Sequence, residues 1–227
     1  MNNQADTIDL NRDKTLTSSL NRTMYFFIKR LFDILMAIIG IIAMIPIALI
    51  VKVSYMLTGD FDSIFYKQKR IGKNGEEFDF YKFRSMIPNA DKVLKELLKN
   101  DKKLAKEYKI NKKLEHDPRV TKMGNILRKT SLDELPQVLN IIRNDMSVIG
   151  NRPYLPREKE DMGQYYSSII KCKPGVTGMW QANGRSDVGF DYRCKLDDYY
   201  YHNWSVWLDF TILYKTIKSV VYGKGSL

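Results

Sequence analysis

Two adjacent acids, Asp133 and Glu134, stand in the run SLDELPQVLN (131–140) of a chain that is otherwise strongly basic. The 227 residues carry 37 Lys and Arg against 26 Asp and Glu, a formal net charge of +11. Carboxylates among cations can hold Mg²⁺ and accommodate phosphate oxygens. A carboxylate can also attack phosphorus and form an acyl phosphate. The pair therefore indicates phosphoryl-type transfer chemistry.

Ser131 and Glu134 also match a capping box, in which both side chains only satisfy N–H groups at a helix start. Pro136 argues against this interpretation, because a helix capped at Ser131 would place it at the fifth helical position and lose a hydrogen bond. A helix within 132–144 that begins nearer Asp133 puts the proline in its first turn. The two carboxylates would then lie at the positive end of that helix, available to a ligand.

Basic residues flank the acidic pair and are candidates for binding an anionic partner. They are Arg119, Lys122, Arg128, Lys129, Arg143 and Arg152. Charge alone would also suit nucleic-acid binding, but the sequence has no recognition motif for it and a long apolar run does not fit that class. His116 and His202 are the only histidines and neither stands near a cysteine, so a zinc site is not expected.

An apolar run from Met24 to Leu57 follows a polar tail, residues 1–23. Its uncharged core, residues 34–51, is at the lower limit of a bilayer span, and Pro46 is expected to break the helix there. Positive charge on both flanks allows re-entrant insertion from one face, and a single span is the alternative. A core helix would need a polar face. We predict a flexible tail over 1–23, a membrane-inserted helix over 24–57 and a domain at the membrane surface over 58–227.

Local patterns in the later part of the chain predict a mainly helical α+β domain. Two aromatic, part-alternating runs around Gly72 and Gly75 predict a β-hairpin. Residues 89–115 predict one Lys-rich helix whose charged face is solvated or attracted to anionic lipid, and 173–185 predict a Gly-rich loop. Near the C-terminus, a stripe at three- and four-residue spacing predicts an amphipathic helix that packs on the body or lies at a membrane interface. The stripe consists of Trp204, Trp207, Phe210, Tyr214, Ile217 and Val221.

Motifs in order along residues 24–227 resemble those of the bacterial sugar transferases, the monotopic phosphoglycosyl transferases. The longest is DPRVTKMGNILRKTSLDELPQVLNIIRNDMSVIGNRPYLP, residues 117–156. The others are KRLFD, YKQKRIG, FYKFRSM, KPGVTGMWQANGRSD and YYYHNWSVWLDFTILYKTI. So many motifs in register outweigh the capping-box interpretation.

The resemblance implies an α+β fold with a re-entrant helix and an active site on the cytoplasmic face of the bacterial inner membrane. The implied reaction moves a sugar-1-phosphate from a UDP-sugar to a polyprenyl phosphate such as undecaprenyl phosphate and releases UMP. That is the first step of capsule, exopolysaccharide or O-antigen assembly. By resemblance, Asp133 is the nucleophile that forms a phosphosugar-enzyme intermediate, and Glu134 is the ligand of Mg²⁺.

Four cations are expected to bind phosphate groups in such an enzyme. Arg152 and Arg128 correspond to arginines of the family's motifs, and Lys82 and Arg84 in FYKFRSM are further candidates. A surface salt bridge is the alternative for each of them. The family's Gly-Pro-Arg-Pro motif has Asn151 in place of its first proline here, which is expected to loosen the loop.

The segment 184–209 resembles members that transfer glucose- or galactose-1-phosphate, and an N-acetylated sugar is the alternative. The expected partners are a UDP-sugar, undecaprenyl phosphate and membrane lipid, with a homodimer compatible with the sequence and no nucleic acid. A basic membrane-tethered scaffold without catalysis is the alternative from another class. It predicts that substitutions at Asp133 and Glu134 leave function intact.

Overall fold

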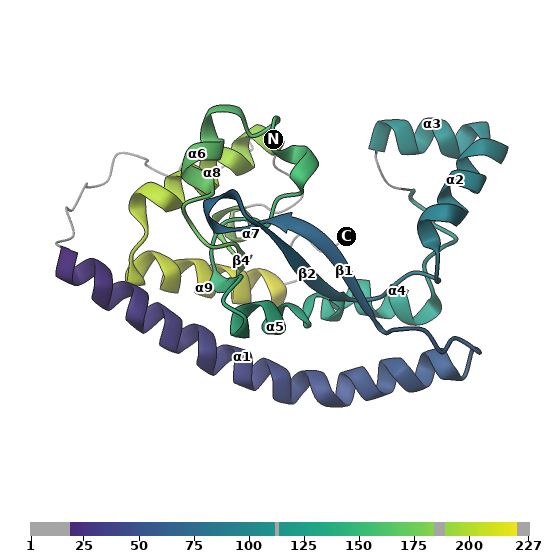
Figure 1. Ribbon diagram of the computed structural model, residues 1–227, viewed down its shortest axis with the longest axis horizontal. Coiled ribbons are helices and arrows are strands. Elements are labelled where there is room, and N and C mark those ends of the chain that lie inside the picture. The colour runs from purple at the N-terminus through teal and green to yellow at the C-terminus, as the bar shows by residue number, and fades with distance from the viewer. Residues whose placement is uncertain (1–18, 112–113, 184–188, 222–227) are drawn as a thin grey trace.

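The computed structural model describes residues 19–111, 114–183 and 189–221 and shows a mainly helical fold with two small sheets (Figure 1). This confirms the predicted α+β class. The elements are α1 (Ser19–Met56), β1 (Phe65–Ile71), β2 (Glu77–Phe83), α2 (Ala90–Asn100), α3 (Lys102–Asn111), α4 (Lys122–Lys129), α5 (Gln137–Ile142), β3 (Ser147–Ile149), α6 (Tyr166–Ile169), β4 (Gly175–Thr177), α7 (Met179–Ala182), α8 (Phe190–Asn203) and α9 (Val206–Val221). Most of the predicted tail, and the first residues of the segment compared for donor sugar, lie outside the described residues.

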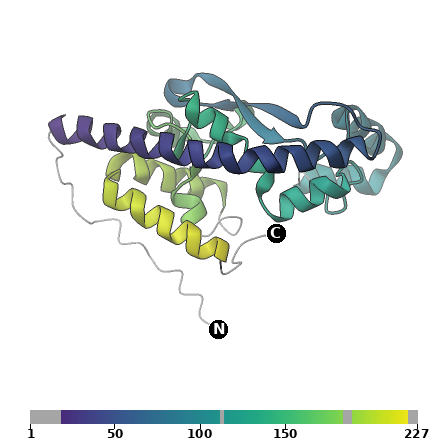
Figure 2. The same ribbon diagram turned by 90° about the horizontal axis from the view of Figure 1, so that it is seen from below.

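Helix α1 runs along one side of the molecule and curves gently over its length (Figures 1 and 2). The predicted break at Pro46 is wrong, because the helix continues through this residue. A proline inside a helix removes one hydrogen bond and crowds the carbonyl four residues earlier, and curvature accommodates both effects. Among the described residues, α1 is the one helix long and apolar enough to cross a membrane.

The KRLFD motif of α1 fastens this helix to the body. Lys29 Nζ lies 2.7 Å from Asp209 Oδ2 in α9. The Arg30 guanidinium donates to the last two carbonyls of α5 at 2.7 and 3.1 Å, where a helix end leaves carbonyls unpaired. Asp33 is buried and accepts hydrogen bonds at 2.8 and 2.9 Å from the first two residues of β3. The charges that precede the apolar core therefore contact protein.

The two faces of α1 have different surroundings. Ala37, Met44, Val51 and Tyr55 are buried in clusters that also contain residues of β2, α4 and α5. The opposite face carries large apolar side chains that are each more than half exposed. They are Phe27, Leu31, Leu35, Ile42, Ile45, Leu49 and Ile50. One face of α1 thus completes the core of the body and the other is an apolar outer surface.

Strands β1 and β2 form the predicted antiparallel hairpin, with Tyr66 opposite Lys82. The connection needs left-handed backbone at Asn74 (φ 60°) and Gly75 (φ 83°), the residue types that adopt it most readily. The glycines here are turn residues, as predicted. The hairpin crosses the body above α5, and Phe80 and Phe83 of β2 belong to the same buried clusters as residues of α1 (Figure 1).

Strand β3 pairs in parallel with β4, and β4 lies within the region 173–185 that was predicted as a Gly-rich loop. Helix α7 follows β4, so the prediction of an irregular loop is wrong for residues 175–177 and 179–182. The strands approach so closely that a Cβ on Gly175 would lie 2.1 Å from the backbone nitrogen of Gly150. The glycines signal this close backbone approach, and three-residue strands are too short for a periodic pattern.

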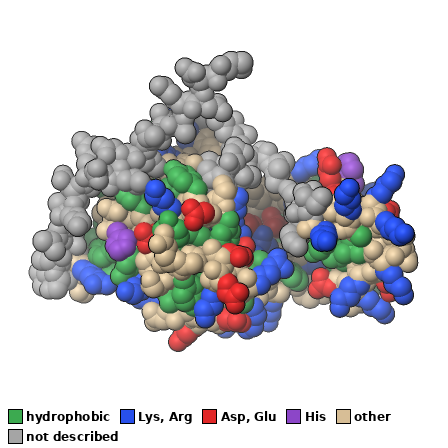
Figure 3. Space-filling view, turned by 90° about the horizontal axis from the view of Figure 1, so that it is seen from above, with side chains coloured by type: hydrophobic (Ala, Val, Ile, Leu, Met, Phe, Trp, Pro, Cys, Tyr) green, Lys and Arg blue, Asp and Glu red, His purple; other side chains and the backbone are tan. Residues whose placement is uncertain are grey.

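The Lys-rich segment forms two helices, α2 and α3, so the prediction of a single helix is wrong. The division is at Asp101, whose carboxylate accepts from the N–H groups of Lys103 and Leu104 at 2.8 and 3.2 Å and so caps α3. These helices stand beside the body, away from the exposed face of α1 (Figure 1). Lys and Arg side chains spread over this arm (Figure 3). Its position away from the apolar face of α1 favours a solvated charged face.

Helix α9 presents its predicted stripe outward. Trp207, Phe210 and Tyr214 are 76%, 60% and 60% exposed, whereas Ile212 is buried. Trp204 precedes the helix and stacks on Tyr25 of α1, with ring centroids 4.5 Å apart. Packing of the whole stripe onto the body is therefore wrong, because the buried face of α9 lies on its other side. Two views place α9 beside α1 (Figures 1 and 2).

Candidate active site

A groove of about 1570 Å³ opens between the β-hairpin, the start of α2 and the segment that carries the acidic pair. All six residues predicted from the sequence line it. They are Lys82, Arg84, Arg128, Asp133, Glu134 and Arg152. The fold therefore brings separate motifs of the sequence to one cavity.

The acidic pair lies on a short 3-10 helix, Leu132–Glu134, that precedes α5. Ser131 has left-handed backbone (φ 57°) and its side chain makes no capping hydrogen bond, so the capping box is absent. Pro136 is the N-cap of α5, which starts at Gln137. Helix α5 is therefore shorter than the predicted 132–144 and begins after Pro136, which could not donate a hydrogen bond inside it. The acids consequently project from a tight turn ahead of α5.

Lys82 is the cation that both acids share. Its Nζ lies 3.2 Å from Asp133 Oδ2 and 2.7 Å from Glu134 Oε1. The Asp133 side chain is 14% exposed and that of Glu134 is 44% exposed. The ammonium also lies 5.7 Å from the centre of the Phe80 ring, which is on the same face of β2. Asp133 is thus the more enclosed carboxylate, and Glu134 is the more open to a solvated ligand.

The position of Lys82 relative to the acids is fixed by Asn140. This asparagine is fully buried in α5, and its side-chain amide bridges two backbone groups of β2. Nδ2 donates to the Asp79 carbonyl at 2.7 Å, and Oδ1 accepts from the Tyr81 N–H at 3.1 Å. Asn140 thereby sets the register between the strand that carries Lys82 and the helix that follows the acidic pair.

Arg152 lies on a loop held by hydrogen bonds on both sides. Asn151 is 1% exposed, its Nδ2 donates to the Ile169 carbonyl at 3.0 Å, and its own carbonyl accepts from Gly175 at 2.8 Å. The Arg152 N–H donates to Asp197 Oδ2 at 3.0 Å. The Asn151 side chain therefore anchors this loop through one hydrogen bond, and the expectation that the loop is looser than one with a proline stays a prediction.

The Arg152 guanidinium is held over two aromatic rings at the groove wall. Its central carbon lies 5.3 Å from the ring of Trp180 and 5.6 Å from that of Tyr154. One nitrogen lies 3.4 Å from Glu158 Oε1. An arginine stacked in this way keeps part of its planar fork available for a phosphate.

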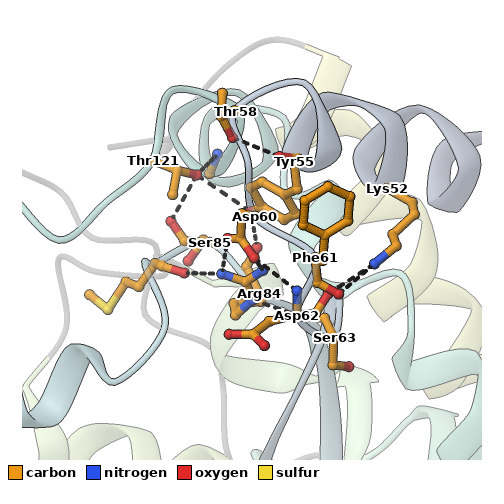
Figure 4. A network of polar contacts seen from close by, with 12 residues as sticks. Lys52, Tyr55, Thr58, Asp60, Phe61, Asp62, Ser63, Arg84, Ser85 and Thr121 are labelled. Carbon is orange, nitrogen blue, oxygen red and sulfur yellow. Dashed lines mark hydrogen bonds and ion pairs between the residues drawn. The ribbon is translucent and has the colours of Figure 1, made fainter.

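Arg84 has a different setting (Figure 4). Its guanidinium makes a bidentate pair with Asp60 at 2.8 and 3.0 Å and also donates to the carbonyls of Ser63 and Met86. These bonds lower the pKa of Asp60. The guanidinium lies 4.6 Å from the Tyr55 ring at the end of α1. Arg84 therefore ties the end of α1 to β2, and a phosphate contact would compete with these bonds.

Arg128 lies at the C-terminal end of α4 and is exposed. Its Nε donates to the Ser85 hydroxyl at 2.9 Å, which holds the side chain along the groove. Within the described residues, its terminal nitrogens make no further side-chain hydrogen bond, so they are oriented and available to a ligand. This arrangement is compatible with the predicted phosphate contact, which stays a prediction.

Glu134 fits the predicted role of Mg²⁺ ligand when the substrate supplies the other oxygens. Within the described residues, no three Asp, Glu, His or Cys side chains gather to hold a metal by themselves. Mg²⁺ is characteristically bound by one or two carboxylates together with substrate phosphates and waters. The exposed carboxylate of Glu134 suits such a cation, and the protein offers no dedicated metal cage in the part that is described.

Several groove residues were missed by the sequence analysis. Four side-chain atoms of groove residues are buried without a hydrogen-bond partner in the described chain, which leaves them to a ligand or water. They are Arg70 Nε, Gln137 Oε1, Trp180 Nε1 and Gln181 Oε1. Burial, with a smaller contribution from the charge of nearby Arg152, lowers the pKa of Arg70 to about 10. The sequence offered one indication of these residues, because all four lie within the motifs YKQKRIG, SLDELPQVLN and KPGVTGMWQANGRSD.

Comparison with known proteins agrees with these motifs. The pattern that defines the family described as "Bacterial sugar transferase" matches residues 24–223. The chain is 44% identical to the exopolysaccharide production protein ExoY of Sinorhizobium fredii, over 87% of both chains. It is 43% identical to an undecaprenyl-phosphate galactose phosphotransferase of Salmonella typhimurium, and 40% identical to a UDP-galactose-lipid carrier transferase of Erwinia amylovora.

Each match to these last two covers 88% of this chain and 42% of the relative, so the chain spans about two fifths of their length. The family match itself extends over most of the chain and includes every residue of the groove named above. The chain belongs to the bacterial sugar transferase family and is a sugar-transferring enzyme, as its motifs predicted.

Proposed function

We propose that the protein transfers a hexose-1-phosphate from a UDP-sugar to undecaprenyl phosphate, the first step in assembling an exopolysaccharide or capsule. The observation that carries the proposal is the groove in which Asp133, Glu134 and Lys82 meet and which Arg152 also lines. It supplies a nucleophile and cations for a dianionic substrate. A scaffold without catalysis would need no such arrangement.

In the first step, an Asp133 oxygen attacks the sugar-bearing phosphorus of the donor. The bond from that phosphorus to the bridging oxygen breaks, and UMP leaves with the electron pair. The products are UMP and a hexose-phosphoryl aspartate. Lys82, 3.2 Å from Asp133, reduces the repulsion between the carboxylate and the incoming phosphate oxygens.

In the second step, an oxygen of the lipid phosphate attacks the same phosphorus. The bond to Asp133 breaks, which regenerates the carboxylate and gives a lipid diphosphate that carries the hexose. Arg152 and Arg128 at the groove wall are placed to orient the phosphates in both steps. When bound by Glu134 and the donor's diphosphate, Mg²⁺ would offset charge on the departing UMP.

Galactose is the donor sugar that we favour. Two relatives at 43% and 40% identity are named for galactose transfer. Glucose is the second candidate and an N-acetylated hexose the third. Galactose, glucose and the N-acetylated hexoses differ from one another at one or two hydroxyl or amide groups. Relative rates of UMP release across a panel of UDP-sugars therefore decide among them.

We further propose that the exposed apolar face of α1 enters the cytoplasmic leaflet of a bacterial inner membrane, with the groove on the cytoplasmic side. Helix α1 packs on the body from Tyr25 to Tyr55, so in this pose the body could not lie on one side of a bilayer that the helix crosses. Insertion from one face is therefore favoured over a single span. A homodimer stays a prediction.

The test is release of UMP by the detergent-purified full chain with Mg²⁺ and undecaprenyl phosphate. We expect release with UDP-galactose, and a loss of at least about a thousandfold for Asp133→Asn. Asp161→Asn, at an exposed acid outside the groove lining, is the matched control and should keep full activity. Without lipid acceptor, about one UMP per enzyme should appear together with a hexose-phosphate adduct in the intact mass.

Failure to release UMP from every UDP-hexose and every UDP-N-acetylhexose tested would overturn the proposal. So would full activity of Asp133→Asn. Activity with UDP-N-acetylhexoses alone would leave the reaction in place and correct the donor.

A further inference from the structure

Asp197 in α8 is a fully buried carboxylate behind the loop that carries Arg152. Its side chain is 0% exposed. Oδ2 accepts from the backbone N–H of Arg152 at 3.0 Å and from the hydroxyl of Tyr154 at 2.9 Å. Oδ1 is buried and has no hydrogen-bond partner in the described residues. The acid thus uses one oxygen for two bonds and leaves the other unpaired.

A buried carboxylate with one unpaired oxygen lowers the stability of the folded protein. An ionised carboxylate in an apolar environment loses hydration that two hydrogen bonds replace only in part. Burial raises the pKa of Asp197 from 3.8 to about 7, although its bonds to Arg152 and Tyr154 oppose the shift. A neutral side chain of the same shape would fill the space at lower cost. Unpaired buried polar atoms in a native protein call for a reason other than packing.

Both hydrogen bonds of Asp197 end on groups that determine where the Arg152 guanidinium lies. One holds the main chain of Arg152, and the other holds Tyr154, whose ring lies 5.6 Å from the guanidinium. Tyr154 is 1% exposed and contacts Phe190 edge-on, so its ring has little freedom. The carboxylate therefore fixes both the backbone and one aromatic surface of this arginine.

Charge gives a second reason for an acid at this position. Burial lowers the pKa of both Arg70 and Arg193, and the charge of nearby Arg152 lowers it further. Arg193 lies 5.1 Å from the Trp180 ring, which Arg152 also contacts. Three neighbouring guanidinium groups repel one another. Glu158 offsets this repulsion at all three, and the Asp197 carboxylate, when ionised, offsets it at Arg152.

We propose that Asp197 is a positioning residue of the transfer reaction, whose carboxylate holds Arg152 in the groove ready for the donor's phosphate. The consequence for activity rests on the proposed function, whereas the contact between Asp197 and the Arg152 loop does not. Asp197 does not touch the reacting atoms. It acts through Arg152, so its effect should disappear when that arginine is absent.

The first arm of the test measures the position of Arg152 directly. In Asp197→Asn the side-chain shape and one acceptor oxygen are retained while the charge is removed. We expect the ¹⁵N order parameter of the Arg152 Nε–H, assigned by its loss in Arg152→Lys, to fall in Asp197→Asn. The matched control is Asp198→Asn, at the next residue of α8, which contacts Ser168 and His202 and not the loop.

The second arm is a double-mutant cycle on kcat/KM for UMP release. We expect Asp197→Asn to lower kcat/KM about tenfold, the value of roughly one charge-assisted hydrogen bond. In an Arg152→Ala background the same substitution should have no further effect, which a general loss of folding would not produce. Thermal unfolding of each variant checks that the fold is retained.

The pH dependence gives a third readout. The groups facing Asp197 are Arg152, Tyr154, Cys194 and Cys172, and burial raises the pKa of Tyr154, of Cys194 to about 11 and of Cys172 to about 12. Asp197 therefore titrates alone among them near neutral pH. The ratio of wild-type to Asp197→Asn kcat/KM should rise as pH increases through about 7.

An unchanged Arg152 order parameter, or a loss of activity that multiplies fully with that of Arg152→Ala, would overturn the proposal. If the wild-type protein releases no UMP, the proposed function fails, and the order parameter still decides whether Asp197 positions Arg152.

Discussion

At the scale of single residues, the site depends on one lysine that two acids share. Lys82 lies between Asp133 and Glu134, where a metal-only mechanism would leave the carboxylates to repel each other. The ammonium can follow the phosphate oxygens as they arrive because it is held on a flexible stem. In the proposed reaction, Lys82 would therefore offset the negative charge of both Asp133 and the incoming donor phosphate.

Replacing Lys82 tests this arrangement. We expect Lys82→Ala to lower kcat/KM for UMP release at least about a hundredfold, because the charge next to the attacked phosphorus is lost. Lys69→Ala is the matched control, since Lys69 lies on the adjacent strand and pairs with Asp79 at 2.8 Å while 59% exposed. Equal effects of the two substitutions would assign Lys82 to general electrostatics of the surface.

A residue-scale prediction for stability concerns Asp197. Because its pKa in the folded protein, about 7, lies above the unfolded value of 3.8, the folded state binds the proton more tightly. Stability that is present below pH 3.8 is therefore lost as pH rises through 7, by on the order of 4 kcal/mol for that difference.

Asp197→Asn removes this titration. Its Tm relative to wild type should rise between pH 5 and pH 8, as followed by thermal unfolding in detergent, with Asp198→Asn as the reference variant. A Tm difference that stays constant over this interval would show that Asp197 keeps an ordinary pKa.

Residue types and motifs were sufficient to find the acids and their cations, but not their contacts. Asp133 and Glu134 were found because two acids and a proline stand together in a basic chain. The hydrogen bond between Asp197 and Arg152 joins residues 45 positions apart, so no local sequence pattern could predict it. Arg84 was grouped with the phosphate ligands because its partner Asp60 lies in an unpatterned loop.

At the scale of elements, the site is a junction between β2 and the turn before α5, held in register by Asn140. Its amide forms the same pair of bonds that a neighbouring strand would form with Asp79 and Tyr81. A strand shifted by one residue would turn Lys82 to the other face, away from the acids. The junction therefore matters more to the site than the length of either element.

Asn140→Ala should leave two buried backbone groups without partners, at about 1–3 kcal/mol each. We expect a lower Tm and a fall of about tenfold or more in kcat/KM. The additional substitution Lys82→Ala should then cost less than it does in the wild type, because the register that places Lys82 is already lost. Asn100→Ala, at the exposed end of α2, is the control. Full additivity with Lys82→Ala would contradict this account.

Elements with a strong local pattern were predicted well. The hairpin and α9 follow from alternation and helical spacing, whereas the parallel pair β3 and β4 joins short segments that gain their partners only in the folded chain. The break expected at Pro46 shows the opposite case. A local rule for proline was overridden by the long apolar flanks that pack along the body on either side of it.

At the scale of the whole molecule, an apolar surface on α1 and a basic arm lie on different sides of the body (Figures 1 and 3). This separation predicts that membrane binding depends on the outer face of α1. The triple substitution of Ile42, Ile45 and Leu49 by Gln should move the protein out of floating vesicles of anionic phospholipid, because these side chains are each more than 60% exposed.

The matched control is Ile126→Gln, at an apolar residue of α4 that is 54% exposed. It should float with the vesicles as the wild type does. Loss of binding on charge reversal of the α2–α3 lysines, with the α1 triple variant still bound, would instead assign membrane contact to the arm.

The burial of Ala37, Met44, Val51 and Tyr55 under the body has a consequence for how the protein is made. Helix α1 leaves the ribosome before any strand or helix that packs on it, so its inner face is a template on which the later segments assemble. In the proposed membrane-bound state, folding of the enzyme would thereby be tied to delivery of α1 to the membrane. We expect a fragment that starts after residue 57 to lack part of its own core and to be inactive.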